Sequence, residues 1–385
     1  MASFAFNTVG QVTFGEGASS RIGEIAKARL GRRIFLVTDP GLLRSGILEP
    51  ALQSLRSAGA EVRVYSEVVA DPPEAVIEAA VALAVEFGGD SVIGFGGGSS
   101  MDVAKLVALL ALGKERLADV YGVGNAKGPR LPLMLVPTTA GTGSEVTPIS
   151  IVTTGASEKK GVVTPVILPD IALLDPELTY GLPPATTAMT GIDAMVHAIE
   201  AHASASANNN PLSRSIAREA LRLLGASLER AVRDGQDRAA RADNLLGAML
   251  AGQAFANSPV AAVHALAYPI GGHYHVPHGL SNSLVLPHVL RFNAVTAAEA
   301  YAETSVCAFP RLAALPAAER AAAFADELDE LARRCGLPTR LRDVGIPREA
   351  IDSLAADAML QTRLLVNNPR ALSQADARDI YAAAW

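Results

Sequence analysis

The histidines of this chain are concentrated in one region, since all seven lie between His197 and His288. Asp193 and His197 are four residues apart, so on a helix both side chains project from one face and can bind a common ion. His264 and His278 supply two further imidazoles. Imidazole and carboxylate suit Fe²⁺, Zn²⁺ or another first-row divalent metal better than Ca²⁺ or Mg²⁺. The pattern indicates a metal site, although an isolated pair like Asp193 and His197 also occurs on ordinary helix surfaces.

A glycine-rich turn is the second feature with chemical meaning. The apolar run SVIGFG, residues 91–96, leads into GGGSSMD and then into a helical pattern. Glycines at a strand-to-helix turn let the backbone approach a pyrophosphate, whose charge is stabilised by the free N–H groups of the helix start. A tight turn without a ligand is the alternative, because such a turn alone is a weak signal. The candidate phosphate-binding residues are Gly96, Gly97, Gly98 and Ser99, with Asp102 in the first helical turn.

Two kinds of pattern follow one another along the chain. From residue 4 to about 180, short apolar runs alternate with helical patterns, which predicts an α/β domain with a Rossmann-like, mostly parallel sheet. After residue 183 only helical patterns follow, so we expect domains at 1–182 and 183–385 with an active site in the cleft between them. The expected strands are a pair within 4–14 and single strands at 34–39, 62–68, 91–96, 131–137 and 171–175. The expected helices are 18–30, 47–58, 73–87, 100–112, 185–203, 211–230, 236–257, 259–271, 279–293, 317–335 and 373–384.

Composition and charge indicate which classes of partner are not expected. The formal net charge is −6 and Lys and Arg form no run, so a nucleic-acid partner is not expected. Apolar runs are too short to span a bilayer, and residues 1–10 do not have the pattern of a signal peptide, so we expect a soluble protein with no membrane partner. Two cysteines make no disulfide framework, which fits the cytoplasm.

On these residues the chain resembles the iron-containing (group III) alcohol dehydrogenases. That family holds its metal with an Asp and a His four apart, and with two more histidines inside a signature that here reads HALAYPIGGHYHVPHG. The matching positions are Asp193, His197, His264 and His278. The resemblance implies a dehydroquinate synthase-like fold and bound Fe²⁺, with Zn²⁺ as the alternative ion. The complete ligand set argues against metal-free relatives such as the maleylacetate reductases.

The resemblance also assigns the cofactor residues. A GGGS-x-x-D loop binds the pyrophosphate in the family, and an earlier strand-end Asp, here Asp39, faces the adenosine ribose. An Asp there accepts a hydrogen bond from the ribose 2′-OH and repels a 2′-phosphate, which favours NAD over NADP. A plain Asp-Pro-Gly turn is the alternative for Asp39. The string PTTAGTGSEVT, residues 137–147, resembles the second cofactor segment. The further contacts implied by this matching are Thr138, Thr139, Thr142, Ile151, Lys159 (or its neighbour Lys160) and Leu178.

The chain departs from a common family pattern at Tyr268, where many members carry a histidine thought to relay a proton. We hypothesise that Tyr268 positions cofactor or substrate without titrating near neutrality, because the pKa of an unperturbed tyrosine is about 10. His273 or His275 would then relay the proton. Phe255 and Leu364 match residues of the family's substrate pocket, although both also suit an ordinary core. The histidines interpreted as structural are His202 and His288.

The resemblance covers nearly the whole chain and implies an NAD-dependent, Fe²⁺-dependent alcohol dehydrogenase or aldehyde reductase. The reaction would transfer a hydride between a small primary alcohol or diol and NAD. Two alternatives share the fold: a zinc polyol dehydrogenase of the glycerol type and a hydroxyacid-oxoacid transhydrogenase. A noncatalytic protein that binds NAD and metal is the alternative from another class. A homodimer is expected by analogy with relatives.

Overall fold

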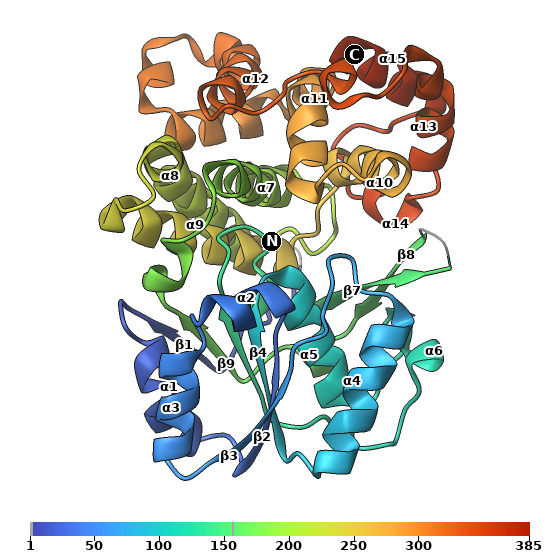
Figure 1. Cartoon of the computed structure of the whole chain (residues 1–385). Coiled ribbons are helices and arrows are strands. Elements are labelled where there is room, and N and C mark those ends of the chain that lie inside the picture. Colours follow the sequence, from blue (N-terminus) through green and yellow to red (C-terminus); the bar gives the residue numbers. More distant parts are fainter. Residues whose placement is uncertain (1–2, 156–157) are drawn as a thin grey trace. The chain divides into compact units, whose positions relative to one another are not determined.

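The computed structural model describes residues 3–155 and 158–385, which fold as two compact units (Figure 1). An α/β unit comprises residues Asn7–Thr139 and Gly143–Tyr180. A helical unit comprises Gly181–Trp385, together with Ala140–Thr142 and the described residues up to Phe6. Each unit has its own hydrophobic interior and is described by itself.

A six-stranded sheet lies at the centre of the α/β unit, in the order β1-β9-β6-β4-β2-β3, and every neighbouring pair is parallel. The parallel sheet predicted from the alternating pattern is thereby confirmed. All residues of β4, β6 and β9 are buried, as is typical of strands covered on both faces. The strands are β1 (Gln11–Phe14), β2 (Arg33–Val37), β3 (Glu61–Tyr65), β4 (Ser91–Gly96), β6 (Leu133–Pro137) and β9 (Ile171–Leu174).

The two faces of this sheet carry separate apolar cores. In β2, Phe35 and Val37 belong to one core, whereas Ile34 and Leu36 belong to the other, because successive side chains of a strand point to opposite faces. The first core includes residues of α4 and α5, and the second includes residues of α1 and α3. The helices of this unit are α1 (Ile22–Lys27), α2 (Pro40–Ser45), α3 (Glu49–Ser57), α4 (Glu74–Phe87), α5 (Gly98–Leu110) and α6 (Leu117–Val120).

Two strand features of the α/β unit differ from the sequence prediction, and the short helices α2 and α6 were also not predicted. The strand pair predicted within residues 4–14 is wrong: β1 is a single strand, and its partner is the distant β9. The second difference is a small sheet of order β5-β8-β7 that was not predicted. Two of its strands, β7 and β8, combine hydroxyl, charged and aliphatic side chains, so their apolar signal is weak. They pair antiparallel, and β8 also pairs in parallel with the two-residue strand β5. These strands are β5 (Gly122–Val123), β7 (Ile149–Thr154) and β8 (Glu158–Val163).

The second unit is helical, as the sequence predicted. The helix predicted at 279–293 is wrong at its end, because α11 continues to Ala308 through a kink at Ala297. Two shorter helices, α13 and α14, were not predicted. The helices are α7 (Pro184–Ala203), α8 (Pro211–Arg233), α9 (Arg238–Asn257), α10 (Ala262–Tyr274), α11 (His278–Ala308), α12 (Ala317–Arg334), α13 (Ile351–Ala358), α14 (Thr362–Leu365) and α15 (Gln374–Ala384).

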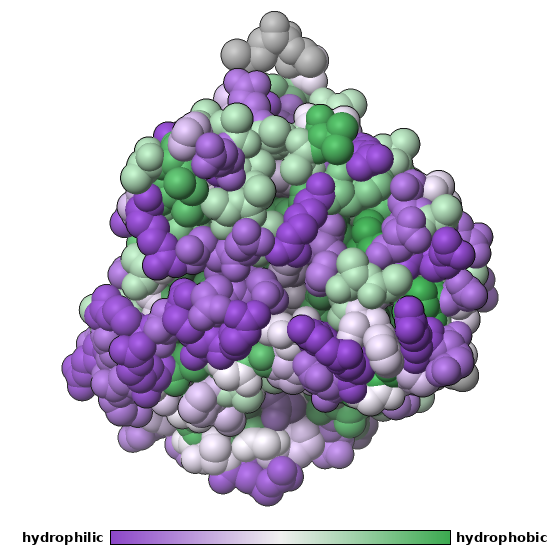
Figure 2. All heavy atoms as spheres, turned by 90° about the horizontal axis from the view of Figure 1, so that it is seen from above, coloured by the Kyte–Doolittle hydropathy of each residue, from purple (hydrophilic) through white to green (hydrophobic). Residues whose placement is uncertain are grey.

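The outer surface reflects the amphipathic character of these helices. On the face seen in Figure 2, hydrophilic side chains are interspersed with smaller hydrophobic clusters. Among the helices within residues 3–155 and 158–385, none is both long enough and apolar enough to cross a membrane.

A buried lysine ties α5 to the segment that precedes and forms β7. Lys105 is fully buried, and its Nζ donates to Ser144 Oγ at 2.7 Å and to the Ile149 carbonyl at 2.6 Å. The Asp102 carboxylate lies 3.6 Å away. Burial lowers the pKa of Lys105 to about 8, against the opposing attraction of Asp102 and Glu145, so the ammonium is still charged at pH 7.

Removing this ammonium is expected to destabilise the protein. Replacing Lys105 by Met keeps an apolar stem but leaves Asp102 and Glu145 without their buried cation. We expect the free energy of unfolding, measured by urea denaturation at pH 7, to fall by about 3–5 kcal/mol. The matched control is Lys159→Met, because Lys159 pairs with the largely exposed Asp71 and such pairs contribute at most about 1 kcal/mol. Equal losses in the two variants would contradict a special role for Lys105.

Candidate metal centre and nucleotide turn

Three helices of the helical unit bring the predicted metal ligands together. Asp193 projects from the middle of α7, His264 from the first turn of α10, and His278 is the first residue of α11. Gly279 allows α11 to approach α7 closely, because a Cβ at this position would overlap the carbonyl oxygen of Met189. The glycine that follows His278 therefore permits the close packing that brings this ligand to Asp193.

The ligand atoms of Asp193, His264 and His278 all lie within 4.8 Å of one another. Asp193 Oδ1 is 3.9 Å from His264 Nε2 and 3.6 Å from His278 Nε2. The first two side chains are buried, whereas the His278 side chain is 44% exposed. Burial alone would raise the pKa of Asp193, but neighbouring imidazoles and a hydrogen bond outweigh it and hold this pKa below its usual value.

His197, the fourth predicted ligand, lies beside this group of three and outside it. Its ring stacks on that of His264, with centroids 4.8 Å apart, and on that of Phe255 at 4.3 Å. Within the described residues, His197 Nδ1 is buried and has no hydrogen-bond partner. Burial lowers the pKa of His197 to about 3, although the carboxylate of Asp193 opposes this shift. The ring is therefore neutral at pH 7, which is the form that binds metals.

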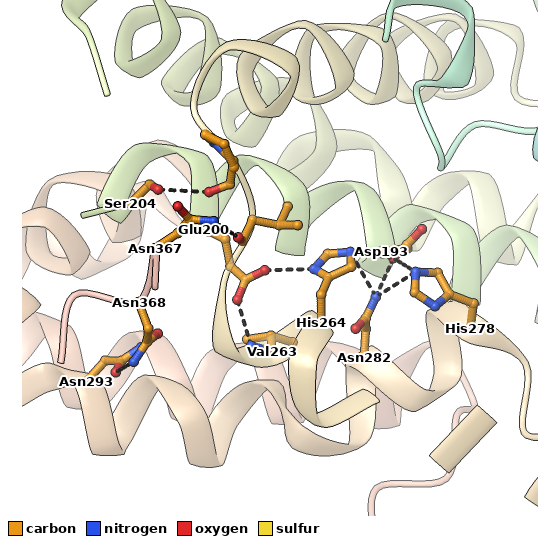
Figure 3. A network of polar contacts seen from close by, with 12 residues as sticks. Asp193, Glu200, Ser204, Val263, His264, His278, Asn282, Asn293, Asn367 and Asn368 are labelled. Carbon is orange, nitrogen blue, oxygen red and sulfur yellow. Dashed lines mark hydrogen bonds and ion pairs between the residues drawn. The ribbon is translucent and has the colours of Figure 1, made fainter. Parts of the chain in front are cut away.

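Asn282 is a central residue of the site that sequence reasoning missed. Its Nδ2 donates to Asp193 Oδ1 at 2.6 Å and lies 3.4 Å from His264 Nε2 and 3.3 Å from His278 Nε2 (Figure 3). The amide nitrogen is the positive end of a dipole, so three electron-rich atoms converge on one positive group. A signal was present, because Asn282 follows His278 by four residues on one helix.

The donor set fits a first-row divalent cation. One carboxylate oxygen and two imidazole nitrogens lie close together, and the neutral imidazole of His197 stands next to them, its buried Nδ1 without a hydrogen-bond partner among the described residues. Nitrogen and oxygen donors of this kind suit Fe²⁺ and Zn²⁺ alike. Asp193, His264 and His278 are the residues that would hold such an ion, and ligation by His197 stays a prediction.

Tyr268 and the two histidines predicted to relay the proton have different surroundings. The ring of Tyr268 lies 5.9 Å from that of His278, at a tilt of 50°. His273 Nε2 lies 2.6 Å from an oxygen of Asp357, and both side chains are partly exposed. His275 ends α10 in a left-handed conformation, with φ of 54°. The ring of Tyr268 thus lies near that of a proposed ligand, and its positioning role stays a prediction.

The glycine turn lies in the α/β unit, where β4 ends and α5 begins. Gly96 has φ of 155°, and a Cβ there would lie only 2.7 Å from Ser100 Oγ. At Gly97, by contrast, the nearest atom to an added Cβ would be 3.7 Å away, in Thr139. Gly97 is the N-cap of α5 and provides no side-chain hydrogen bond, so the first N–H groups of the helix are left for another acceptor.

The remaining predicted cofactor residues fall into two sets. Thr138 follows β6 and its N–H donates to the Gly96 carbonyl, so this residue and Thr139 lie at the glycine turn.

Other predicted cofactor residues have partners within the fold. Asp102 accepts hydrogen bonds from Ser144 Oγ and the Ile151 N–H, Lys159 pairs with Asp71, and Leu178 is part of an apolar core. Asp39 caps α2 by accepting from the N–H groups of Gly41 and Leu42 through Oδ1. Thr142 belongs to the segment grouped with the helical unit.

The two predicted pocket residues are both buried in the helical unit. Phe255 stacks on His197, and Leu364 lies on α14 with 2% of its surface exposed. Their contact with a substrate stays a prediction. Glu200, which sequence reasoning also missed, lies 2.7 Å from His264 Nδ1.

Comparisons with known proteins agree over both units. Residues 10–176 match the family model described as iron-containing alcohol dehydrogenase, and residues 187–385 match the C-terminal model of the Fe-containing alcohol dehydrogenase family. The chain is 41% identical over 375 residues to long-chain-alcohol dehydrogenase 1 of Geobacillus thermodenitrificans, covering 96% of this chain and 94% of that protein.

Solved structures show the same likeness. A 1,3-propanediol oxidoreductase superposes with a TM-score of 0.95 and 32% identity over 100% of both chains. Sulfoacetaldehyde reductase from Bifidobacterium kashiwanohense, in complex with NAD⁺, gives a TM-score of 0.89 and 28% identity over 100% of this chain and 99% of that one. The chain therefore belongs to the iron-containing alcohol dehydrogenase family and is an oxidoreductase that acts on alcohols.

Proposed function

We propose that this protein is an NAD-dependent, Fe²⁺-dependent alcohol dehydrogenase or aldehyde reductase acting on small primary alcohols or diols. The observation that carries the proposal is the convergence of Asp193, His264 and His278 within 4.8 Å. When bound, the metal would supply Lewis acidity toward the alcohol or carbonyl oxygen, and NAD would supply the hydride acceptor. Zn²⁺ is the alternative ion, because the same donors suit it.

The surrounding residues have separate tasks in this proposal. Asn282 orients the Asp193 carboxylate through its hydrogen bond of 2.6 Å. Phe255 packs on the ring of His197 and excludes water from that side. The Tyr268 phenol, next to His278, orients the substrate or cofactor by hydrogen bonding and keeps its proton near neutral pH.

The glycine turn is the proposed binding site for the NAD pyrophosphate. Gly97 leaves room for a ligand to approach the backbone, and the start of α5 offers N–H groups to an anion. Asp39 uses Oδ1 to cap α2. The negative charge of this carboxylate would repel a 2′-phosphate, so Asp39 would select NAD over NADP.

We also propose that the enzyme works in the cytoplasm as a homodimer. Cys307 and Cys335 are both free thiols, which fits a reducing compartment. The dimer is inferred from the family resemblance alone.

Metal dependence is the first test of the proposed function. Protein stripped with a chelator should lose NAD-linked oxidation of short primary alcohols and diols, and anaerobic addition of Fe²⁺ should restore it. His264→Ala should lower kcat/KM by more than the factor of about 10–100 that loss of an outer-shell partner costs. His288→Gln, which changes a histidine outside the ligand group, should keep its activity. Turnover that is indifferent to metal would exclude the proposal.

Substitution of Gly97 tests the pyrophosphate site. In Gly97→Ala the new methyl group meets no atom closer than 3.7 Å, so the free energy of unfolding should change little. The same methyl group would occupy the space that the pyrophosphate needs, and we expect the Kd for NAD to rise about tenfold or more, which is about 1.4 kcal/mol. Calorimetric titration measures it. Gly181→Ala is the matched control, since the methyl group added there meets nothing within 4 Å. Unchanged NAD affinity in Gly97→Ala would remove the turn from the cofactor site.

Cofactor choice can be tested by changing only a charge. Asn caps helices as well as Asp does, so Asp39→Asn should keep α2 intact while removing the repulsion of a 2′-phosphate. We expect the ratio of kcat/KM for NAD to that for NADP to fall about tenfold, equivalent to about 1.4 kcal/mol. Asp237→Asn, at the N-cap of α9, should leave the ratio as it is. If the Asp39 variant also left it unchanged, Asp39 would be a capping residue only.

A further inference from the structure

Glu200 lies behind the proposed ligand His264, on the side away from the metal-facing nitrogen. It projects from α7, is 6% exposed, and uses both carboxylate oxygens at the start of α10 (Figure 3). Oε2 lies 2.7 Å from His264 Nδ1, and Oε1 accepts from the N–H of Val263 at 2.6 Å. Ala261, the N-cap of α10, provides no side-chain hydrogen bond. Glu200 therefore caps α10 from a neighbouring helix, through the N–H of Val263, and holds the imidazole of His264.

This contact determines which nitrogen of His264 carries the proton. An ionised carboxylate only accepts hydrogen bonds, so the imidazole must donate from Nδ1. In a neutral ring the other nitrogen, Nε2, then has a free lone pair. Nε2 is the atom that faces Asp193 Oδ1 at 3.9 Å and Asn282 Nδ2 at 3.4 Å. The Glu200 contact thus orients the ring and keeps its lone pair available on the side of the ligand group.

The segment leading into α10 has further ties to the rest of the helical unit. Ser258 Oγ donates to the Ala201 carbonyl at 2.7 Å, and Ser204 Oγ donates to the Pro259 carbonyl at 2.8 Å. Asn367 Nδ2 donates to the Val260 carbonyl at 3.0 Å (Figure 3). These bonds hold the backbone before His264 without help from Glu200, whose particular contribution is to the imidazole itself.

We propose that Glu200 is a positioning residue, which fixes the tautomer and orientation of His264 and thereby raises the affinity of the site for a divalent metal. The inference rests on the proposed function in taking His264 as a metal ligand. Carboxylates that accept the second N–H of a ligating histidine typically change metal affinity by about 10–100-fold.

Glu200→Gln is the variant that isolates this role. Its oxygen can still accept from the Val263 N–H, but its NH₂ group would face Nδ1 and favour the tautomer protonated on Nε2. We expect the Kd of the full-length metal-free protein for Zn²⁺ and Co²⁺ to rise about 10–100-fold. Competition with a chromophoric chelator, without substrate or NAD, measures this Kd. An unchanged Kd in Glu200→Gln would overturn the proposal.

Glu303→Gln is the matched control on another carboxylate beside a buried histidine. Glu303 Oε2 lies 3.2 Å from His202 Nε2, and the His202 side chain is 2% exposed. Neither residue belongs to the group of three ligand residues. This variant should bind metal as the wild type does, and an equal loss of affinity in both variants would overturn the specific role of Glu200.

A tautomer measurement on the wild-type protein tests the proposal independently of Glu200→Gln. In ¹⁵N-labelled, metal-free wild-type protein, long-range ¹H–¹⁵N correlations should show the His264 proton on Nδ1, with assignment from the spectrum of His264→Asn. A proton on Nε2 would overturn the proposal even if Glu200→Gln does not fold. Wild-type protein that binds no divalent ion would overturn the proposed metal function, whereas equal binding by wild type and Glu200→Gln would overturn only the role of Glu200.

Discussion

Burial of the Asp193 carboxylate is the constraint on which the centre of the helical unit depends. A carboxylate with 2% exposure is costly unless donors or positive charge replace the water that it has lost. The fold provides a donor on α11, Asn282, and places the imidazoles of His264 on α10 and His278 on α11 beside the carboxylate, where they could share a cation with it. Because these partners come from separate helices, the packing of α7, α10 and α11 and the chemistry of the site depend on each other.

The site is arranged in layers behind this carboxylate. Asn282 holds Asp193, His264 faces both, and Glu200 holds His264 from behind while capping α10. Polar networks in a low-dielectric interior rigidify a structure when every member has a partner. The exceptions are informative, because Asn282 Oδ1 and His197 Nδ1 are buried without a hydrogen-bond partner among the described residues. Both unpaired atoms belong to side chains that surround the proposed metal position.

In the α/β unit, a buried cation holds a helix in place. Lys105 connects α5 to the segment before β7 and engages the hydroxyl of Ser144, which also donates to Asp102. These contacts fix the body of α5, while the beginning of the helix, at Gly97, has no side-chain cap. A rigid helix with a free N-terminus suits the proposed binding of a pyrophosphate, because the donors are already in position before the ligand arrives.

The amino-acid sequence by itself determined the local features of this protein. The spacing of Asp193 and His197, the strand-turn-helix at Gly97 and the change from alternating to helical patterns all depend on backbone periodicity, which a few neighbouring residues specify. Family membership followed from the same short motifs. Only the tertiary structure decided which distant groups meet: β1 with β9, Lys105 with Ser144, and Glu200 with His264. It also placed His197 beside the ligand group of three, since contacts across tens of residues depend on how helices and strands pack, and no periodicity in the sequence encodes that choice.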